Sequence, residues 1–194
     1  MKKAIVYEVP GADPRRDLIQ RKDLTIVAIS EPGELLAVTA DLVAEGVALI
    51  ELCGGVSPRW RPVVSAAAGP AVRVSSVSFG IESLLPAARF NQAYLEGRPP
   101  AQAFLFLEAG ADPSADRFTR TIALQHTIFV PLPDEADAPA VARELAARGI
   151  GLIELYGGFT SAGAAAVIDA VDARAPVGVG GFTLEATLPC GAAA

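Results

Sequence analysis

The sequence is poor in the residues that most often carry metal, redox or nucleophilic chemistry. It has one histidine, His126, and two cysteines, Cys53 and Cys190, with no CxxC spacing. Two isolated cysteines form no disulfide framework. A lone histidine supports neither a histidine-rich zinc site nor a Cys-His or Ser-His-Asp catalytic site. These chemistries are therefore disfavoured.

Lysine is also scarce, and basic residues form no patch. The three lysines are Lys2, Lys3 and Lys22, and the net charge is −6. We expect no nucleic-acid partner, because such partners require clustered basic residues. Schiff-base chemistry is disfavoured because no lysine stands at the carboxyl end of a predicted strand. GxGxxG and Walker patterns are missing too.

Long apolar runs are absent. The apolar stretch after Lys3 is short and meets Glu8, which does not match a signal peptide. No run of about 18 apolar residues predicts a membrane span. We therefore expect no membrane partner and a cytoplasmic location. Hydrophobic residues still make up 52% of the chain, which is ample for a core.

The chain contains an internal duplication. The stretch GVALIELCGG at 46–55 recurs as GIGLIELYGG at 149–158, and GADP at 11–14 recurs at 110–113. The first alignment continues without a gap to the Leu-Pro pairs at 85–86 and 188–189. Such self-similarity marks a repeated structural unit. We predict a first repeat at 1–97, a linker at 98–101 and a second repeat at 102–194.

Each repeat has the pattern of strands alternating with helices. Short runs rich in valine, isoleucine and leucine predict strands at 3–8, 24–30, 47–53, 72–78, 102–108, 124–131, 150–156 and 176–181. Helical spacing predicts helices at 34–45, 58–68, 81–96 and 138–148, with a shortened helix after Phe182. We interpret both GADP segments as a loop followed by a helix N-cap.

Strands that alternate with helices are typical of parallel α/β folds. We expect a parallel (βα)8 TIM-like barrel made of two (βα)4 half-barrels, since one four-stranded sheet alone would bury little core. The sequence leaves one alternative open, which is a pair of small four-stranded doubly wound sheets.

The LIELCGG stretch at 49–55, together with the opening KAIVYEVPGAD at 3–13, resembles a family of small uncharacterised bacterial proteins of about 100 residues. The resemblance covers 1–96 and, more loosely, 102–189. It implies a fold class without a mechanism. It also implies that a single-copy relative dimerises, and we expect this fused chain to be a monomer or a homodimer. The glycine-rich ends of the last two strands also resemble the phosphate loops of phosphate-binding βα-barrels.

Carboxylates stand at the carboxyl ends of strands, where parallel α/β folds bind ligands. Glu51 and Glu154 lie within apolar strands, and Glu8 and Glu108 end the first strand of each repeat. Burying a carboxylate is costly unless it is paired, hydrogen-bonded or bound to a metal. We predict acid–base catalysts, with Mg²⁺ or Mn²⁺ as the candidate cofactor. The structural alternative is that these carboxylates cap backbone N–H groups of a neighbouring loop.

Further candidate residues flank these glutamates. Tyr156 and Cys53 occupy equivalent positions and are predicted proton donors or nucleophiles, although a buried cysteine is commonly a core residue. The predicted anion-binding residues are Gly54, Gly55, Gly157, Gly158, Gly180, Gly181 and Arg59. Glycines let backbone N–H groups approach an anion, and they equally serve tight turns.

These residues together predict a lyase or isomerase that acts on a small anionic metabolite, phosphorylated or carboxylate, by carboxylate acid–base chemistry. Two other classes remain open. One is a non-catalytic protein that binds a small molecule at the same place, and the other is a structural protein whose carboxylates only brace the fold.

Overall fold

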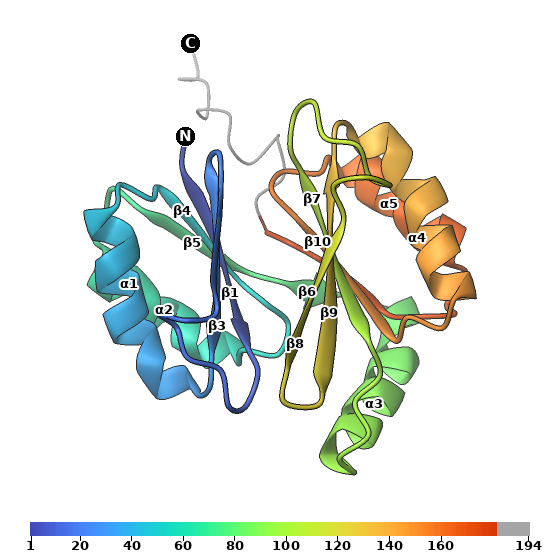
Figure 1. Cartoon of the computed structure of the whole chain (residues 1–194), viewed down its shortest axis with the longest axis horizontal. Coiled ribbons are helices and arrows are strands. Elements are labelled where there is room, and N and C mark those ends of the chain that lie inside the picture. The colour runs from blue at the N-terminus through green and yellow to red at the C-terminus, as the bar shows by residue number, and fades with distance from the viewer. Residues whose placement is uncertain (182–194) are drawn as a thin grey trace.

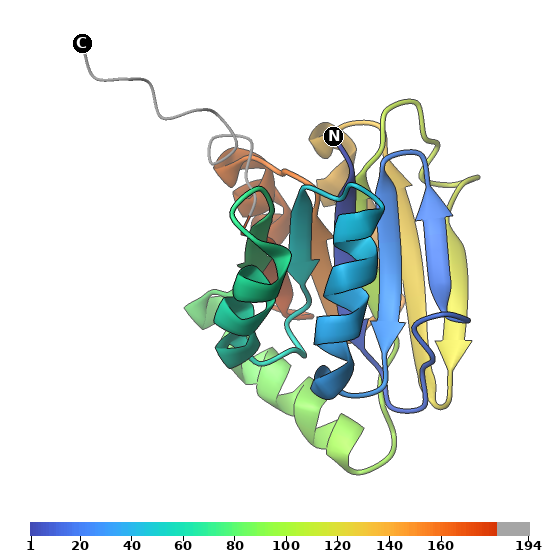
Figure 2. The same ribbon diagram turned by 90° about the vertical axis from the view of Figure 1, so that its left-hand side faces the viewer.

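Two stacked β-sheets form the centre of the molecule. The computed structural model describes residues 1–181. In Figure 1 the layers run from helices α1 and α2, through the first and second sheets, to helices α4 and α5. Figure 2, turned by 90°, shows α1 in front of the first sheet. The architecture is therefore a four-layer α/β/β/α sandwich.

The first sheet comes from the first repeat and is mostly parallel. Its strand order is β2-β3-β1-β4-β5, in which β2 pairs antiparallel with β3. The strands are β1 (Lys3–Glu8), β2 (Leu18–Arg21), β3 (Leu24–Ile29), β4 (Leu49–Leu52) and β5 (Arg73–Ser76). Helices α1 (Leu35–Ala44) and α2 (Arg61–Ala68) each follow a short 3-10 turn, η1 (Pro32–Glu34) and η2 (Pro58–Trp60).

The second sheet repeats this plan and gains one strand. Its order is β6-β11-β10-β7-β9-β8. The second repeat supplies β7 (Gln102–Leu107), β8 (Phe118–Ile122), β9 (Gln125–Leu132), β10 (Leu152–Tyr156) and β11 (Val177–Val179). It also supplies η3 (Glu135–Asp137), α4 (Ala138–Ala147) and α5 (Ser161–Val171).

The added strand crosses over from the first repeat. Strand β6 (Ser78–Phe79) pairs antiparallel with β11, and α3 (Ile81–Leu95) follows it on the side of the second sheet (Figure 1). Ser83 of α3 is buried, and its Oγ accepts a hydrogen bond from the Val177 N–H at 3.0 Å. The end of the first repeat therefore completes the sheet of the second, so the two repeats are intertwined.

The expected closed barrel is wrong, because the strands of residues 1–181 form two separate open sheets. The segments after β1 and β7 form the antiparallel strands β2 and β8 where the barrel needs helices. The alternative of two sheets has the right number of sheets but also differs in detail. The sheets have five and six strands, and the inner face of each is covered by the other sheet instead of by helices.

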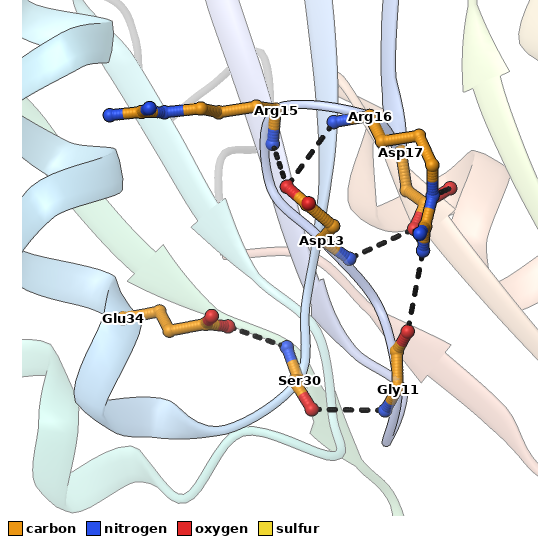
Figure 3. A network of polar contacts seen from close by, with 7 residues as sticks. All are labelled: Gly11, Asp13, Arg15, Arg16, Asp17, Ser30 and Glu34. Atoms are coloured by element: carbon orange, nitrogen blue, oxygen red, sulfur yellow. Dashed lines mark hydrogen bonds and ion pairs between the residues drawn. The ribbon is translucent and has the colours of Figure 1, made fainter.

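The GADP loop shows why the first helix is missing. Asp13 Oδ1 accepts hydrogen bonds from the N–H groups of Arg15 at 2.9 Å and Arg16 at 3.4 Å (Figure 3). Asp17 Oδ2 accepts from the Asp13 N–H at 2.9 Å, which closes a compact turn. The chain then enters β2, so the predicted helix N-cap is wrong here. Aspartate stabilises such turns as readily as helix starts.

Aromatic side chains fill the space between the two sheets. The Tyr7 and Phe104 rings meet edge to face with centroids 5.3 Å apart, and Phe104 and Tyr156 do the same at 5.2 Å. Phe129 lies edge-on to Tyr7 and stacks on Phe118 with centroids 5.0 Å apart. These rings join the core of the first repeat to that of the second, whose other side packs against α4 and α5.

Among the helices of residues 1–181, none combines the length and the apolarity needed to cross a membrane.

We predict that Phe129→Ala lowers the free energy of unfolding by about 3–5 kcal/mol, because it leaves a cavity at a fully buried ring of the inter-sheet layer. Urea unfolding followed by circular dichroism measures this change. The matched control is Leu124→Ala at a 63% exposed leucine, which should change stability by less than about 0.5 kcal/mol. Equal effects of the two variants would contradict an aromatic layer that holds the sheets together.

Candidate functional site

The two buried glutamates reach across between the repeats. Glu154 Oε1 accepts a hydrogen bond from the Gly54 N–H at 3.0 Å, and Glu51 Oε2 accepts from the Gly157 N–H at 2.9 Å. Their exposures are 1% and 3%. Each carboxylate thus caps the loop after the equivalent strand of the other repeat. This is the structural role that the sequence left open as the alternative to catalysis.

Two positions beside these glutamates require glycine, because the glutamate oxygens approach the backbone too closely for a Cβ atom. A Cβ on Gly54 would lie 2.7 Å from Glu154 Oε1 and 2.6 Å from the Phe79 ring. A Cβ on Gly180 would collide with Glu51 Oε1. Gly157 and Gly158 need glycine for another reason, since their φ angles are +86° and +103°.

The predicted anion-binding role is weakened for three of these residues, because their N–H groups already bind protein oxygens. Gly54 and Gly157 donate to the glutamates, and the Gly180 N–H donates to the Leu155 carbonyl at 2.9 Å. Gly181 lies against Ser75 of β5. Arg59 is exposed on η2.

The Glu154 carboxyl group has a second donor. The Tyr156 O–H donates a hydrogen bond to Glu154 Oε2. Burial raises the pKa of Glu154 to about 7, although the hydrogen bonds from Tyr156 and Gly54 oppose the rise. Burial, together with the charge of Glu154, raises the pKa of Tyr156 well above its ordinary value. Tyr156 therefore stays protonated while Glu154 titrates near neutral pH.

Cys53 is buried, and its chemistry follows from that burial. Burial first, and then the charge of Glu154, raises the pKa of the Cys53 thiol to about 12. The thiol is therefore protonated at neutral pH, which disfavours the predicted role as a nucleophile because the thiolate is the reactive form.

A cavity of about 370 Å³ lies between the sheets at the carboxyl ends of β1 and β4, and α3 forms one of its walls. It brings together five of the residues predicted from the sequence, which are Glu8, Cys53, Gly54, Gly55 and Glu154. Its other lining residues are Phe79, Ala87, Phe90, Asn91, Tyr94, Gln102, Phe104, Gln125 and Leu152. The predicted residues Glu51, Glu108, Arg59, Tyr156, Gly157, Gly158, Gly180 and Gly181 do not line it.

The second group of lining residues was missed by sequence reasoning. Polar site residues were predicted only at the carboxyl ends of strands. Because the two sheets face each other, the amino ends of β7, β9 and β10 lie opposite the carboxyl ends of β1 and β4. The duplication offered one signal that could have found them. Gln102 occupies in β7 the position that Lys3 occupies in β1, so the two repeats differ in their polar residue at this point.

Glu8 is partly exposed, and among residues 1–181 no group donates a hydrogen bond to its carboxylate. Burial first, and then the charge of Glu31, raises the pKa of Glu8. Burial likewise raises the pKa of Tyr94, with the charge of Glu8 adding to the rise. The cavity wall therefore carries a carboxylate that is free to meet a ligand, beside a phenol.

The opposite end of the inter-sheet space is built differently. It holds a cavity of about 360 Å³, where Arg21 binds Glu108 with two hydrogen bonds of 2.6 and 2.8 Å. This pairing lowers the pKa of Glu108. Lys3 Nζ donates to the Gly157 carbonyl at 2.8 Å, and Lys22 Nζ donates to the Ala109 carbonyl at 3.2 Å. Basic side chains of the first repeat therefore clamp the loops of the second.

Glu8 and Glu108 are consequently not equivalent. Glu8 is the last residue of β1, whereas the last residue of β7 is Leu107 and Glu108 follows it. The two carboxylates therefore occupy non-equivalent positions and line different cavities at the two ends of the inter-sheet space. The sequence prediction treated them as a matched pair, whereas the structure places them in different surroundings.

Within residues 1–181, no three histidine, cysteine, aspartate or glutamate side chains gather in an arrangement that would hold a metal ion. Mg²⁺ or Mn²⁺ as cofactor stays a prediction from the sequence.

We predict that Glu154 makes stability depend on pH. A pKa raised from the ordinary 4.5 to about 7 stabilises the fold fully below pH 4.5, and that contribution is lost as pH rises through 7. The free energy of unfolding of wild type relative to Glu154→Gln should therefore fall by about 3 kcal/mol between pH 4.5 and 8. Urea titrations across this range measure it. Parallel pH profiles of the two proteins would contradict a neutral-range pKa.

We predict a favourable coupling of about 1–3 kcal/mol between Arg21 and Glu108, because the pair is bidentate and only 23% and 13% exposed. A double-mutant cycle of Arg21→Gln and Glu108→Gln, read by urea unfolding, measures it. The matched control pair is Arg148 and Glu144, which is exposed and should couple by less than about 1 kcal/mol. Additive effects at Arg21 and Glu108 would show that this ion pair contributes nothing to stability.

Comparison with known proteins agrees with the duplication. The model of a family of unknown function, DUF6506, matches residues 1–92 and again residues 101–192. No curated protein matches the chain. The match confirms the expected uncharacterised family in two tandem copies, while the likeness to phosphate-binding barrels is not shown. Because the two matches together cover most of its length, the chain belongs to the family of unknown function DUF6506.

Proposed function

We propose that this protein binds a small metabolite in the cavity behind α3 and acts on it by carboxylate acid–base chemistry, as a lyase or isomerase. One observation carries the proposal: Glu8 and Glu154 both stand in the wall of a single cavity. General acid–base catalysis needs a titratable group within reach of the substrate and a pKa near the working pH.

The cavity has the size and lining that suit a small molecule. Its volume of about 370 Å³ falls in the range of small-molecule sites, which are mostly apolar with a few polar groups. Phe79, Phe90 and Phe104 supply apolar walls, and Gln102 and Gln125 supply amides. Among residues 1–181 no lysine or arginine lines the cavity, so the anionic ligand expected from the sequence has no cationic partner there.

The two carboxylates suit different tasks. Glu8 has no hydrogen-bond donor among the described residues, so its oxygens are available to accept a proton from a bound molecule. Glu154 is held by Gly54 and Tyr156, so it is fixed in place and acts mainly through its charge. We therefore assign the proton transfer to Glu8, with the Tyr94 phenol as the neighbouring donor.

A second candidate function is non-catalytic binding of a small molecule in the same cavity. It is favoured by the engagement of both Glu154 oxygens in contacts that hold the fold, and by the protonated Cys53 thiol. The sandwich would then present a ligand without changing it.

The test is an NMR screen of metabolite mixtures in D₂O with the full chain. Acid–base chemistry should convert one metabolite or exchange its carbon-bound protons with solvent, and Glu8→Gln should slow this by roughly 10²–10⁴-fold. Glu45→Gln, an exposed carboxylate outside the cavity, is the matched control and should keep full activity. Line broadening of a metabolite without exchange or conversion would favour the binding function, and neither effect would overturn both candidates.

A further inference from the structure

We propose that the ligand of this cavity is a protonated organic amine, whose ammonium group is bound by Glu8 and Gln125 and whose apolar part packs against the phenylalanines. The inference deepens the proposed function by naming a ligand class, and it uses the same cavity. It does not require that the ligand be chemically changed.

Gln125 offers a buried acceptor that lacks a donor among the described residues. Gln125 is 3% exposed and lines the cavity. Its Nε2 donates to the carbonyls of Pro100 and His126, both at 3.1 Å, which fixes the orientation of the amide. Its Oε1 is buried without a hydrogen-bond partner among residues 1–181. Since buried polar atoms are nearly always satisfied, a donor on the ligand would complete this group.

The ionisable groups in the cavity wall are all acids. The titratable side chains that line the cavity are Glu8, Cys53, Tyr94 and Glu154, and no cationic side chain is among them. A carboxylate that, like Glu8, has no hydrogen-bond donor among the described residues of a partly buried site favours a cationic partner over an anion. The ligand must therefore supply both the positive charge and the hydrogen-bond donors.

Aromatic rings form a large part of the cavity lining. Phe79, Phe90, Phe104 and Tyr94 come from β6, α3 and β7 and bound the same space. The faces of aromatic rings attract cations, and their area also accommodates an apolar carbon chain or ring. A hydrated metal ion makes no use of such walls, whereas an alkyl or aryl ammonium does.

The duplication supplies an internal comparison. In the opposite cavity, the positions equivalent to Glu8, Gln102 and Gln125 hold Leu107, Lys3 and Lys22. The acceptor and the carboxylate therefore occur at one end of the inter-sheet space and are replaced by apolar or basic groups at the other. This pattern points to one amine site in the fused chain.

The test uses 2-phenylethylammonium as the probe, with 2-phenylethanol, phenylacetate and tetramethylammonium as its neutral, anionic and N–H-free counterparts. We expect the ammonium probe at millimolar concentration to raise the melting temperature of the full chain more than the other three, since ligands of the native state stabilise it. Calorimetric titration then gives its affinity.

Two variants remove the groups proposed to bind the ammonium: Glu8→Leu installs the equivalent residue of the opposite cavity, and Gln125→Leu removes the amide acceptor. Glu8→Leu and Gln125→Leu should each weaken binding of the ammonium probe by roughly 10- to 100-fold, as expected for losing a hydrogen bond to a charged group. Glu45→Gln should leave it unchanged. Circular dichroism checks that each variant folds, and the milder Glu8→Gln replaces Glu8→Leu if that variant does not.

Each outcome decides the inference. Stronger binding of phenylethanol or phenylacetate would overturn the amine assignment while leaving the cavity as a ligand site. Unchanged ammonium binding in both variants, or no binding of any probe, would also overturn it. Selective ammonium binding without conversion in the NMR screen would support the amine site and remove the catalytic function.

Discussion

The structure depends on one reciprocal pair of hydrogen bonds. Glu51 and Glu154 each leave the inner face of one sheet and accept the backbone N–H of the glycine that follows the equivalent strand of the other sheet. A buried carboxylate needs such donors, and each donor exists only when the two sheets lie face to face. The LIEL-x-GG motif therefore encodes the association of the repeats, because its glutamate and its first glycine serve opposite partners.

The same association explains the cavities and their difference. The two sheets exchange reciprocal hydrogen bonds and leave one space at each end of their interface. At one end Arg21, Glu108, Lys3 and Lys22 link the repeats directly. At the other, glutamines, phenylalanines and Glu8 leave a lined space behind α3. Fusion of two copies frees the ends to diverge, because a mutation in one copy no longer alters both ends, as it would in a dimer of identical chains.

The segment that contains β6 and α3 contributes both to the fold and to the candidate site. These residues belong to the first repeat, yet they extend the second sheet and form one wall of the acidic cavity. Tyr94 and Phe90 thus meet Gln102 and Gln125 only after both repeats have folded together. A site assembled in this way requires the intertwined pair of repeats.

The local sequence determined much of the secondary structure. Apolar runs predicted the cores of eight strands, and helical spacing predicted α1, α2, α3 and α4 to within a few residues, because these patterns reflect burial along one face. The duplication and the family were also visible in the sequence alone. The antiparallel strands β2 and β8 were missed, since a short turn closed by Asp13 reads locally like a helix start.

Tertiary structure decided the rest. Whether Glu51 and Glu154 act as catalysts or stabilise the fold depends on which N–H groups lie opposite them. Those groups are about 100 residues away in the chain. The meeting of Glu8 with Gln125 depends likewise on how two sheets stack. Sequence patterns report the burial of a residue by its neighbours along the chain, whereas partners across an interface are set by the packing of whole layers.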